Sequence, residues 1–102
     1  MNIPESFELF GHKIKVVFDN TSCHVSQAVG LSESNQNTIT LANEKTDGEP
    51  IPESSIEQTF YHELLHMIYD KLGYYKESKD EIKIEQASQL LYQALSTFNK
   101  NS

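Results

Sequence analysis

The sequence predicts an α+β fold in which a small N-terminal antiparallel sheet packs on a C-terminal hairpin of two helices, within one domain spanning residues 1–102. Two observations support this fold class. Residues 7–43 contain short stretches in which apolar side chains alternate with polar ones, as in half-buried strands. From Ser54 onward, apolar side chains recur every three to four positions, as in amphipathic helices.

The expected strands come first along the chain. Residues 7–19 (FELFGHKIKVVFD) are rich in β-branched and aromatic types and predict a strand, or a strand pair broken at Gly11. Residues 20–37 are mostly polar and are interrupted by Gly30. Residues 37–43 (NTITLAN) alternate again and predict a short strand. Residues 44–52 contain Asp47-Gly48 and two prolines, which indicates a turn and an irregular connection.

The first expected helix begins near Ser54. Ser54 and Glu57 have the spacing of a capping box, and Gly73 stands where a left-handed residue would end the helix. Ser78 and Glu81 repeat the capping-box spacing and predict the start of a second helix. This helix is expected to run to about Phe98 and to bury one face, made of Ile84, Ala87, Leu91, Ala94, Leu95 and Phe98.

Composition excludes several classes of function. The formal net charge is −7, and all eight basic residues are lysines, so a nucleic-acid-binding surface is not expected. No apolar run approaches the roughly 20 residues that a membrane span needs. The single cysteine, Cys23, cannot form an internal disulfide and is expected to serve only in packing. Because the N-terminus lacks the pattern of a secretory signal, we expect a cytoplasmic protein.

The motif that carries chemistry lies in the first helix, where residues 62–66 read HELLH. This HExxH pattern is typical of zinc metallopeptidases. Two histidines four positions apart on a helix lie on nearly the same face, roughly 6 Å apart along the axis, so His62 and His66 can both reach one Zn²⁺. Glu63 would then lie beside the open position and act as the catalytic proton carrier.

A catalytic zinc normally has a third protein ligand. In an antiparallel helical hairpin, Glu85 lies level with His66, because the two residues are equally far from the expected helix ends. Glu85 is therefore the expected third ligand. Glu81 is the rival, although it lies about 6 Å nearer the turn. His12 and His24 are further alternatives, although each is more readily explained as a surface or half-buried histidine that binds no metal.

These residues resemble a known family. The HExxH pattern followed by Glu85-Gln86-Ala87-Ser88 looks like the gluzincin pattern, in which a glutamate on the following helix is the third ligand. The chain is most similar to small phage- and prophage-encoded metallopeptidase-like proteins related to the ImmA/IrrE group. Their motifs TxxHExxH and DE are occupied by Thr59, His62, Glu63, His66, Asp80 and Glu81. The resemblance implies a minimal zincin-like fold and zinc-dependent peptide hydrolysis.

Two other polar side chains are candidates for supporting roles. Peptidases of this type use a Tyr or His to stabilise the oxyanion, and Tyr92 follows Glu85 by two helical turns on the same face. Tyr92 is therefore the second expected catalytic residue, with a packing role as its alternative. Asp70, one turn beyond His66, could orient that imidazole, or could simply be solvated.

The expected function is zinc-dependent cleavage of an extended segment of a cytoplasmic protein. The alternative is a non-catalytic, zinc-stabilised binding module of phage or prophage origin that contacts a regulatory protein. For the enzyme, we expect the strand at 38–42 to be a sheet edge: Ile39 and Leu41 would pack on the metal helix, and the backbone near Thr40 would pair with substrate. The sequence leaves the substrate and the oligomeric state open.

Overall fold

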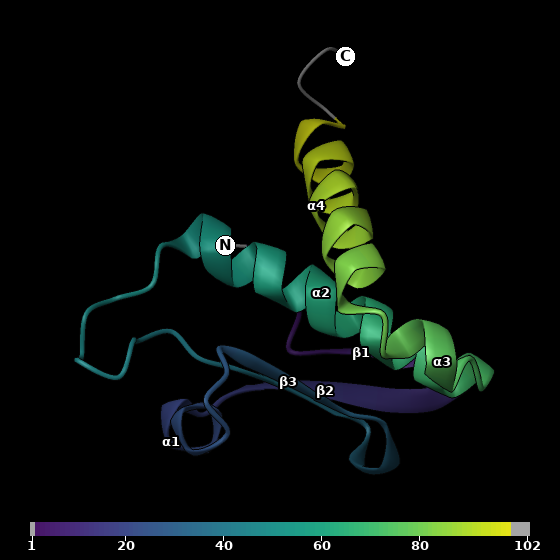
Figure 1. Cartoon of the computed structure of the whole chain (residues 1–102), viewed down its shortest axis with the longest axis horizontal. Coiled ribbons are helices and arrows are strands. Elements are labelled where there is room, and N and C mark those ends of the chain that lie inside the picture. The colour runs from purple at the N-terminus through teal and green to yellow at the C-terminus, as the bar shows by residue number, and fades with distance from the viewer. Residues whose placement is uncertain (1, 99–102) are drawn as a thin grey trace.

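The structure, a computed structural model, describes residues 2–98 and confirms the α+β class. A four-stranded sheet lies against α2, and α4 rises steeply away from α2 on the side opposite the sheet (Figure 1). Along the chain the elements are β1 (Ser6–Leu9), β2 (His12–Phe18), α1 (Asn20–Val25), β3 (Gly30–Glu33), the 3-10 helix η1 (Ser34–Gln36), β4 (Thr38–Leu41), α2 (Glu53–Leu72), α3 (Tyr75–Ser78) and α4 (Glu81–Thr97).

The sheet is mixed, and this corrects the expectation of an antiparallel sheet. Its strand order is β1-β2-β4-β3. The outer pairs β1/β2 and β3/β4 are antiparallel, whereas the central pair β2/β4 is parallel. The reason lies in residues 20–37, where α1 carries the chain past the end of β2 and β3 runs back, so that β4 returns in the direction of β2. As a consequence β3 is an outer strand and β4 a central one.

The helix boundaries correct both expected capping boxes. The residue at the N-cap of α2 is Pro52, without a side-chain hydrogen bond, and Ser54 already lies inside the helix. At the start of α4 the cap is Asp80, whose side chain accepts from the backbone N–H of Lys83. Ser78 belongs to α3 instead. The expected end of α2 is confirmed, because Gly73 adopts a left-handed conformation with φ of 79°.

The core lies between the sheet and α2. Ile14, Ile39 and Leu41 of the sheet are fully buried against a stripe on α2 formed by Ile56, Phe60 and Met67. The expected packing of Ile39 and Leu41 on the HExxH helix is therefore confirmed. This core fixes β4 under α2 and, through the β3/β4 ladder, places β3 beside the same helix.

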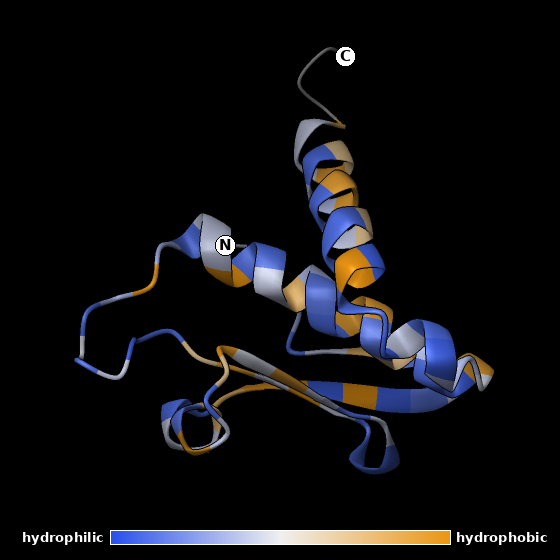
Figure 2. Cartoon of the chain, in the orientation of Figure 1, coloured by the Kyte–Doolittle hydropathy of each residue, from blue (hydrophilic) through white to orange (hydrophobic). Residues whose placement is uncertain are grey.

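Much of the expected apolar face of α4 is not buried, which is a second correction. Ile84 and Ser88 are the buried residues of this helix, and Leu91 is half-buried. The rest of the expected face is exposed: Ala87, Ala94, Leu95 and Phe98. In a hairpin the two helices would lie side by side. Instead α4 crosses α2, so the apolar residues on the part of α4 that projects away from α2 stay exposed (Figure 2). Within residues 2–98, no helix is both long and apolar enough to cross a membrane.

Candidate metal centre

His62 and His66 lie in the middle of α2 and point to the same place. Their Nε2 atoms are 3.2 Å apart, and the ring centroids are separated by 4.9 Å. Both side chains are largely buried, at 16% and 14% exposed. The helical spacing of the HExxH motif thus brings two imidazole nitrogens together, as expected from the sequence.

Glu81, the first residue of α4, completes this cluster. Its Oε2 lies 3.2 Å from His62 Nε2, and its Oε1 lies 3.0 Å from His66 Nε2. A tetrahedral ion with bonds of about 2.0–2.1 Å needs ligand atoms about 3.3 Å apart, which is close to these separations. Imidazole nitrogen and carboxylate oxygen are also donors that zinc accepts. The group His62, His66 and Glu81 could therefore hold a metal ion.

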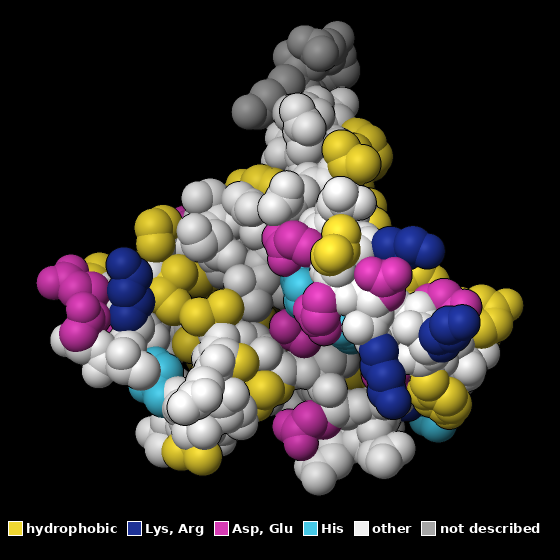
Figure 3. Space-filling view, viewed as in Figure 1, with side chains coloured by type: hydrophobic (Ala, Val, Ile, Leu, Met, Phe, Trp, Pro, Cys, Tyr) yellow, Lys and Arg dark blue, Asp and Glu magenta, His cyan; other side chains and the backbone are white. Residues whose placement is uncertain are grey.

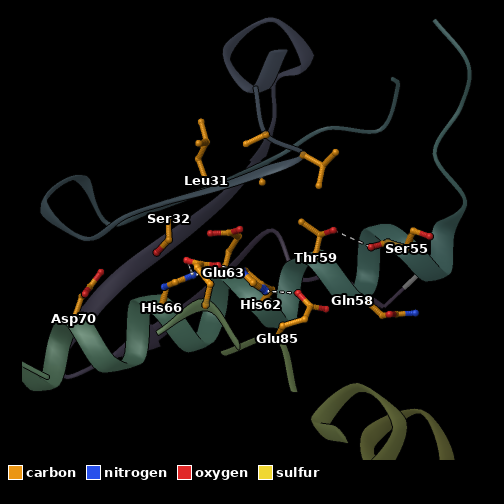
Figure 4. A pocket seen from close by; sticks show the side chains of 14 residues that line it. Leu31, Ser32, Ser55, Gln58, Thr59, His62, Glu63, His66, Asp70 and Glu85 are labelled. Carbon is orange, nitrogen blue, oxygen red and sulfur yellow. Dashed lines mark hydrogen bonds and ion pairs between the residues drawn. The ribbon is translucent and has the colours of Figure 1, made fainter. Parts of the chain in front are cut away.

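The structure places Glu85 elsewhere than expected. Glu85 Oε2 lies 2.9 Å from His62 Nδ1, the ring nitrogen on the side away from the cluster (Figure 4). The contact is an ion pair when the ring is protonated, and Nδ1 of His62 has no hydrogen-bond partner among the described residues. The geometry favours Glu81 over Glu85 as the third ligand. Glu85 is not level with His66, because α3 intervenes and α4 crosses α2, so only the first turn of α4 reaches the two Nε2 atoms.

Ser78 holds the ring of His66 in place, a role that was not expected from the sequence. Its hydroxyl lies 3.2 Å from His66 Nδ1 and donates to the backbone carbonyl of His66 over 3.4 Å. Ser78 is the last residue of α3, and its side chain is buried. With Nδ1 engaged in this way, the Nε2 atom of His66 faces Glu81. Asp70, which the sequence left open between this role and a solvated position, makes no such contact with His66. No pattern in the sequence indicates this role for Ser78, because its position depends on the short helix α3.

Glu63 is buried between α2 and β3. Only 8% of the residue is exposed, and Gly30 of β3 lies directly against it. Burial raises the pKa of Glu63 to about 7; the nearby His62 lowers the pKa, whereas the carboxylates of Glu81 and Glu85 raise it further. A carboxyl group with this pKa can both accept and release a proton near neutral pH, as a general base and acid must.

A cleft of about 640 Å³ opens over these residues, between β3 and α2. Figure 4 shows Glu63, His62 and His66 along its floor, with Ser55 and Thr59 toward one end and Asp70 at the other. In the space-filling view, carboxylates surround the histidines at the centre of this face (Figure 3).

The strand beside the cleft is β3, whereas the sequence predicted the strand at residues 38–42, which is β4. β4 pairs with β2 on one side and with β3 on the other, so the backbone of Thr40 is not free to pair with a substrate. The expected substrate edge at residues 38–42 is therefore wrong. β3 pairs only with β4 within the described sheet and has its other edge open. Its short, polar sequence around Gly30 and Ser32 gave no strand signal.

Other sequence candidates lie outside the site. Tyr92 does not line the cleft; its ring packs 6.2 Å from that of Tyr61, because α4 has by then risen away from the histidines. His24 Nε2 lies 2.8 Å from the backbone oxygen of Glu44, remote from the cluster. His12 is exposed at the start of β2. Cys23 is fully buried, in agreement with a packing role.

Comparison of the chain with protein-family models, with curated proteins and with solved structures gave no match.

Proposed function

We propose that this chain is a zinc-dependent metallopeptidase. The observation that carries the proposal is the convergence of His62, His66 and Glu81 beside a buried glutamate, Glu63, in an open cleft. A structural metal site is normally closed by four protein ligands, whereas a catalytic site keeps one position open. Three donor residues facing a cleft are in keeping with the catalytic type.

Zinc held by His62, His66 and Glu81 would supply Lewis-acid chemistry, polarising a carbonyl oxygen and making water more acidic. The protein's own part in the reaction falls to Glu63. Its carboxylate, on the floor of the cleft, takes a proton from the attacking water and delivers it to the leaving amine. Its burial against Gly30 holds the carboxylate in one place on the cleft floor.

The open edge of β3 provides the means of holding a substrate. Unpaired backbone groups along Gly30–Glu33 can form a ladder with an extended peptide, which adds a strand to the sheet. A peptide bound in this way lies along α2, above Glu63 and the two histidines. The proposed substrate is therefore an extended protein segment, and cytoplasmic proteins are its expected source.

The alternative, a binding module in which zinc only ties two helices together, has one observation in its favour. Glu81 comes from α4 and the histidines from α2, so an ion would link these helices. That role gives no use to Glu63, because a carboxylate buried at the cleft costs desolvation free energy without contributing a ligand.

The test compares the wild-type chain with Glu63→Gln after zinc loading. Both proteins should contain one equivalent of zinc by atomic absorption, and wild type alone should cleave members of an unstructured peptide library, detected by mass spectrometry. Glu63→Gln should cleave at least 100 times more slowly, since general acid–base catalysis contributes typically 10²–10⁴-fold. Equal cleavage by the two proteins would refute the role of Glu63, and zinc loading without cleavage of any peptide would favour the binding module.

A further inference from the structure

Beyond His66 the cleft continues into a second hollow of about 440 Å³. Asp70 and Ser32 line both spaces and so mark the junction. The second hollow lies between the β3–η1 turn and the end of α2, and its other lining residues are Glu33, Ser34, Asn35, Gln36 and Tyr75. All of these carry polar groups, and none of the described lining residues is a lysine.

Asp70 and Ser32 point toward one another across this junction (Figure 4). Within residues 2–98, the carboxylate of Asp70 has no hydrogen bond and no ion pair. The hydroxyl of Ser32 is buried and also has no hydrogen-bond partner. Buried polar groups are normally paired, because leaving one unpaired costs free energy. Ser32 Oγ is such a buried group, and the half-buried carboxylate of Asp70 faces the same space, so together they indicate a position that a ligand group fills.

The lysine next to Asp70 in sequence does not neutralise it. Lys71 Nζ donates to the backbone oxygen of Ser34 over 3.0 Å and to Asn37 Oδ1. These bonds tie α2 to the turn between β3 and β4 and hold the wall of the hollow in place. The negative charge of Asp70 is consequently left available to a ligand, in a chain whose formal net charge is −7.

We propose that this end of the cleft is a subsite for a basic side chain of the substrate, a lysine or an arginine. The inference rests on the proposed peptidase function. Asp70 pairs with the positive charge, and the hydroxyl of Ser32 accepts one of its hydrogen bonds. The ring of Tyr75, 62% exposed, offers a face to the cation and its apolar stem.

The spacing of His66 and Asp70 along α2 sets the position of the basic substrate side chain relative to the cleaved peptide bond. Asp70 follows His66 by one turn of α2, which is about 6 Å along the axis. An extended peptide advances about 3.3 Å per residue. The basic residue therefore lies one or two positions from the cleaved bond, on the Asp70 side.

The test uses fluorescein-labelled decapeptides that carry lysine, norleucine or glutamate at one position and are otherwise identical. Norleucine keeps the apolar stem of lysine and removes the charge. We expect wild type to cleave the best lysine peptide at least ten times faster, in kcat/KM, than its norleucine counterpart. The ratio of kcat/KM for the lysine peptide to that for the norleucine peptide should fall towards one in Asp70→Asn, whereas the matched control Asp47→Asn, in the exposed connection before α2, should keep the wild-type ratio. An active protein without a lysine preference, or Asp70→Asn with the full preference, would overturn the subsite.

Binding of the same peptides separates this inference from the proposed function. Fluorescence anisotropy with the metal-free protein should show tighter binding of the lysine peptide than of the norleucine peptide, and a difference that shrinks in Asp70→Asn and at high salt. If this difference is found and no peptide is cleaved, the subsite stands and the peptidase function fails. If peptides are cleaved but lysine and norleucine peptides bind equally in both proteins, the function stands and the subsite fails.

Discussion

Gly30 lies directly against Glu63 and leaves no room for a larger residue. A methyl group built on Gly30 would lie 3.0 Å from Glu63 Cγ and 2.5 Å from Thr59 Cγ2. The missing side chain of one residue on β3 is therefore what allows the strand to cover the carboxylate on α2. The contact joins the two elements that form the cleft.

Replacing Gly30 with alanine should push β3 away from α2. Overpacking of this kind costs roughly 1–3 kcal/mol, so the melting temperature should fall by several degrees and Glu63 should become more exposed. Thermal melting followed by circular dichroism measures the first effect. The double variant Gly30→Ala/Thr59→Ser removes the closest clashing atom and should recover part of the loss. A single variant that melts like wild type would show that β3 does not depend on this contact.

The two glutamates near the histidines should differ in their effect on metal binding. Glu81 contacts both Nε2 atoms, whereas Glu85 lies at His62 Nδ1. Glu81→Gln should weaken zinc affinity by at least 100-fold, because it removes a charged ligand. Glu85→Gln should weaken affinity by about tenfold, in the range seen for residues that orient a ligand. Competition with a fluorescent zinc chelator measures both, and the reverse ranking would restore Glu85 as the ligand.

Ser78→Ala tests the orientation of His66. Loss of the hydroxyl leaves His66 Nδ1 without its partner, so zinc affinity should fall about 10–100-fold. Ser78→Thr keeps a hydroxyl and serves as the comparison. The readout is zinc affinity at constant pH, together with thermal melting of the metal-free proteins. If Ser78→Ala lowers the melting temperature but leaves zinc affinity unchanged, Ser78 is only a packing residue.

How far the sequence predicts this site depends on which contacts are local. The HExxH spacing alone brings His62 and His66 together, because four residues on a helix fix their relation. Helix α2 and strand β4 follow equally from local patterns and were confirmed. Which glutamate joins the two histidines depends on the crossing of α2 and α4, which no pattern within either helix encodes. Ser78 and the open strand edge depend on α3 and on a polar four-residue strand, β3, that lacks alternation.

The reactivity of the Cys23 thiol tests whether this side chain is buried in the native protein. Burial raises the pKa of its thiol above 9.0, and the charges of Asp19 and Glu63 raise it further. The native thiol should therefore react with iodoacetamide at pH 8 far more slowly than the thiol of the urea-unfolded chain, as counted by mass spectrometry.

The raised pKa of Cys23 also makes the free energy of unfolding depend on pH. Above pH 9 the unfolded chain loses the thiol proton that the native chain retains, so the free energy of unfolding should decline as pH rises through this range. Cys23→Ala removes this contribution, and its decline above pH 9 should be shallower than that of wild type. Urea unfolding at pH 8 and pH 10 measures both slopes, and equal slopes would contradict the raised pKa.

The two isoleucines at the start of α4 form a matched pair for testing how this helix is held. Ile84 is buried, with 1% of the residue exposed, whereas Ile82 is 72% exposed. Ile84→Ala should cost about 2–5 kcal/mol of unfolding free energy, the usual range for a buried isoleucine, while Ile82→Ala should change it by less than about 0.5 kcal/mol. Because α4 carries Glu81, Ile84→Ala should also weaken zinc binding, and Ile82→Ala should not. Urea unfolding of the metal-free proteins and zinc competition measure the two effects. Equal losses from both substitutions would mean that α4 rests on α2 through a different face.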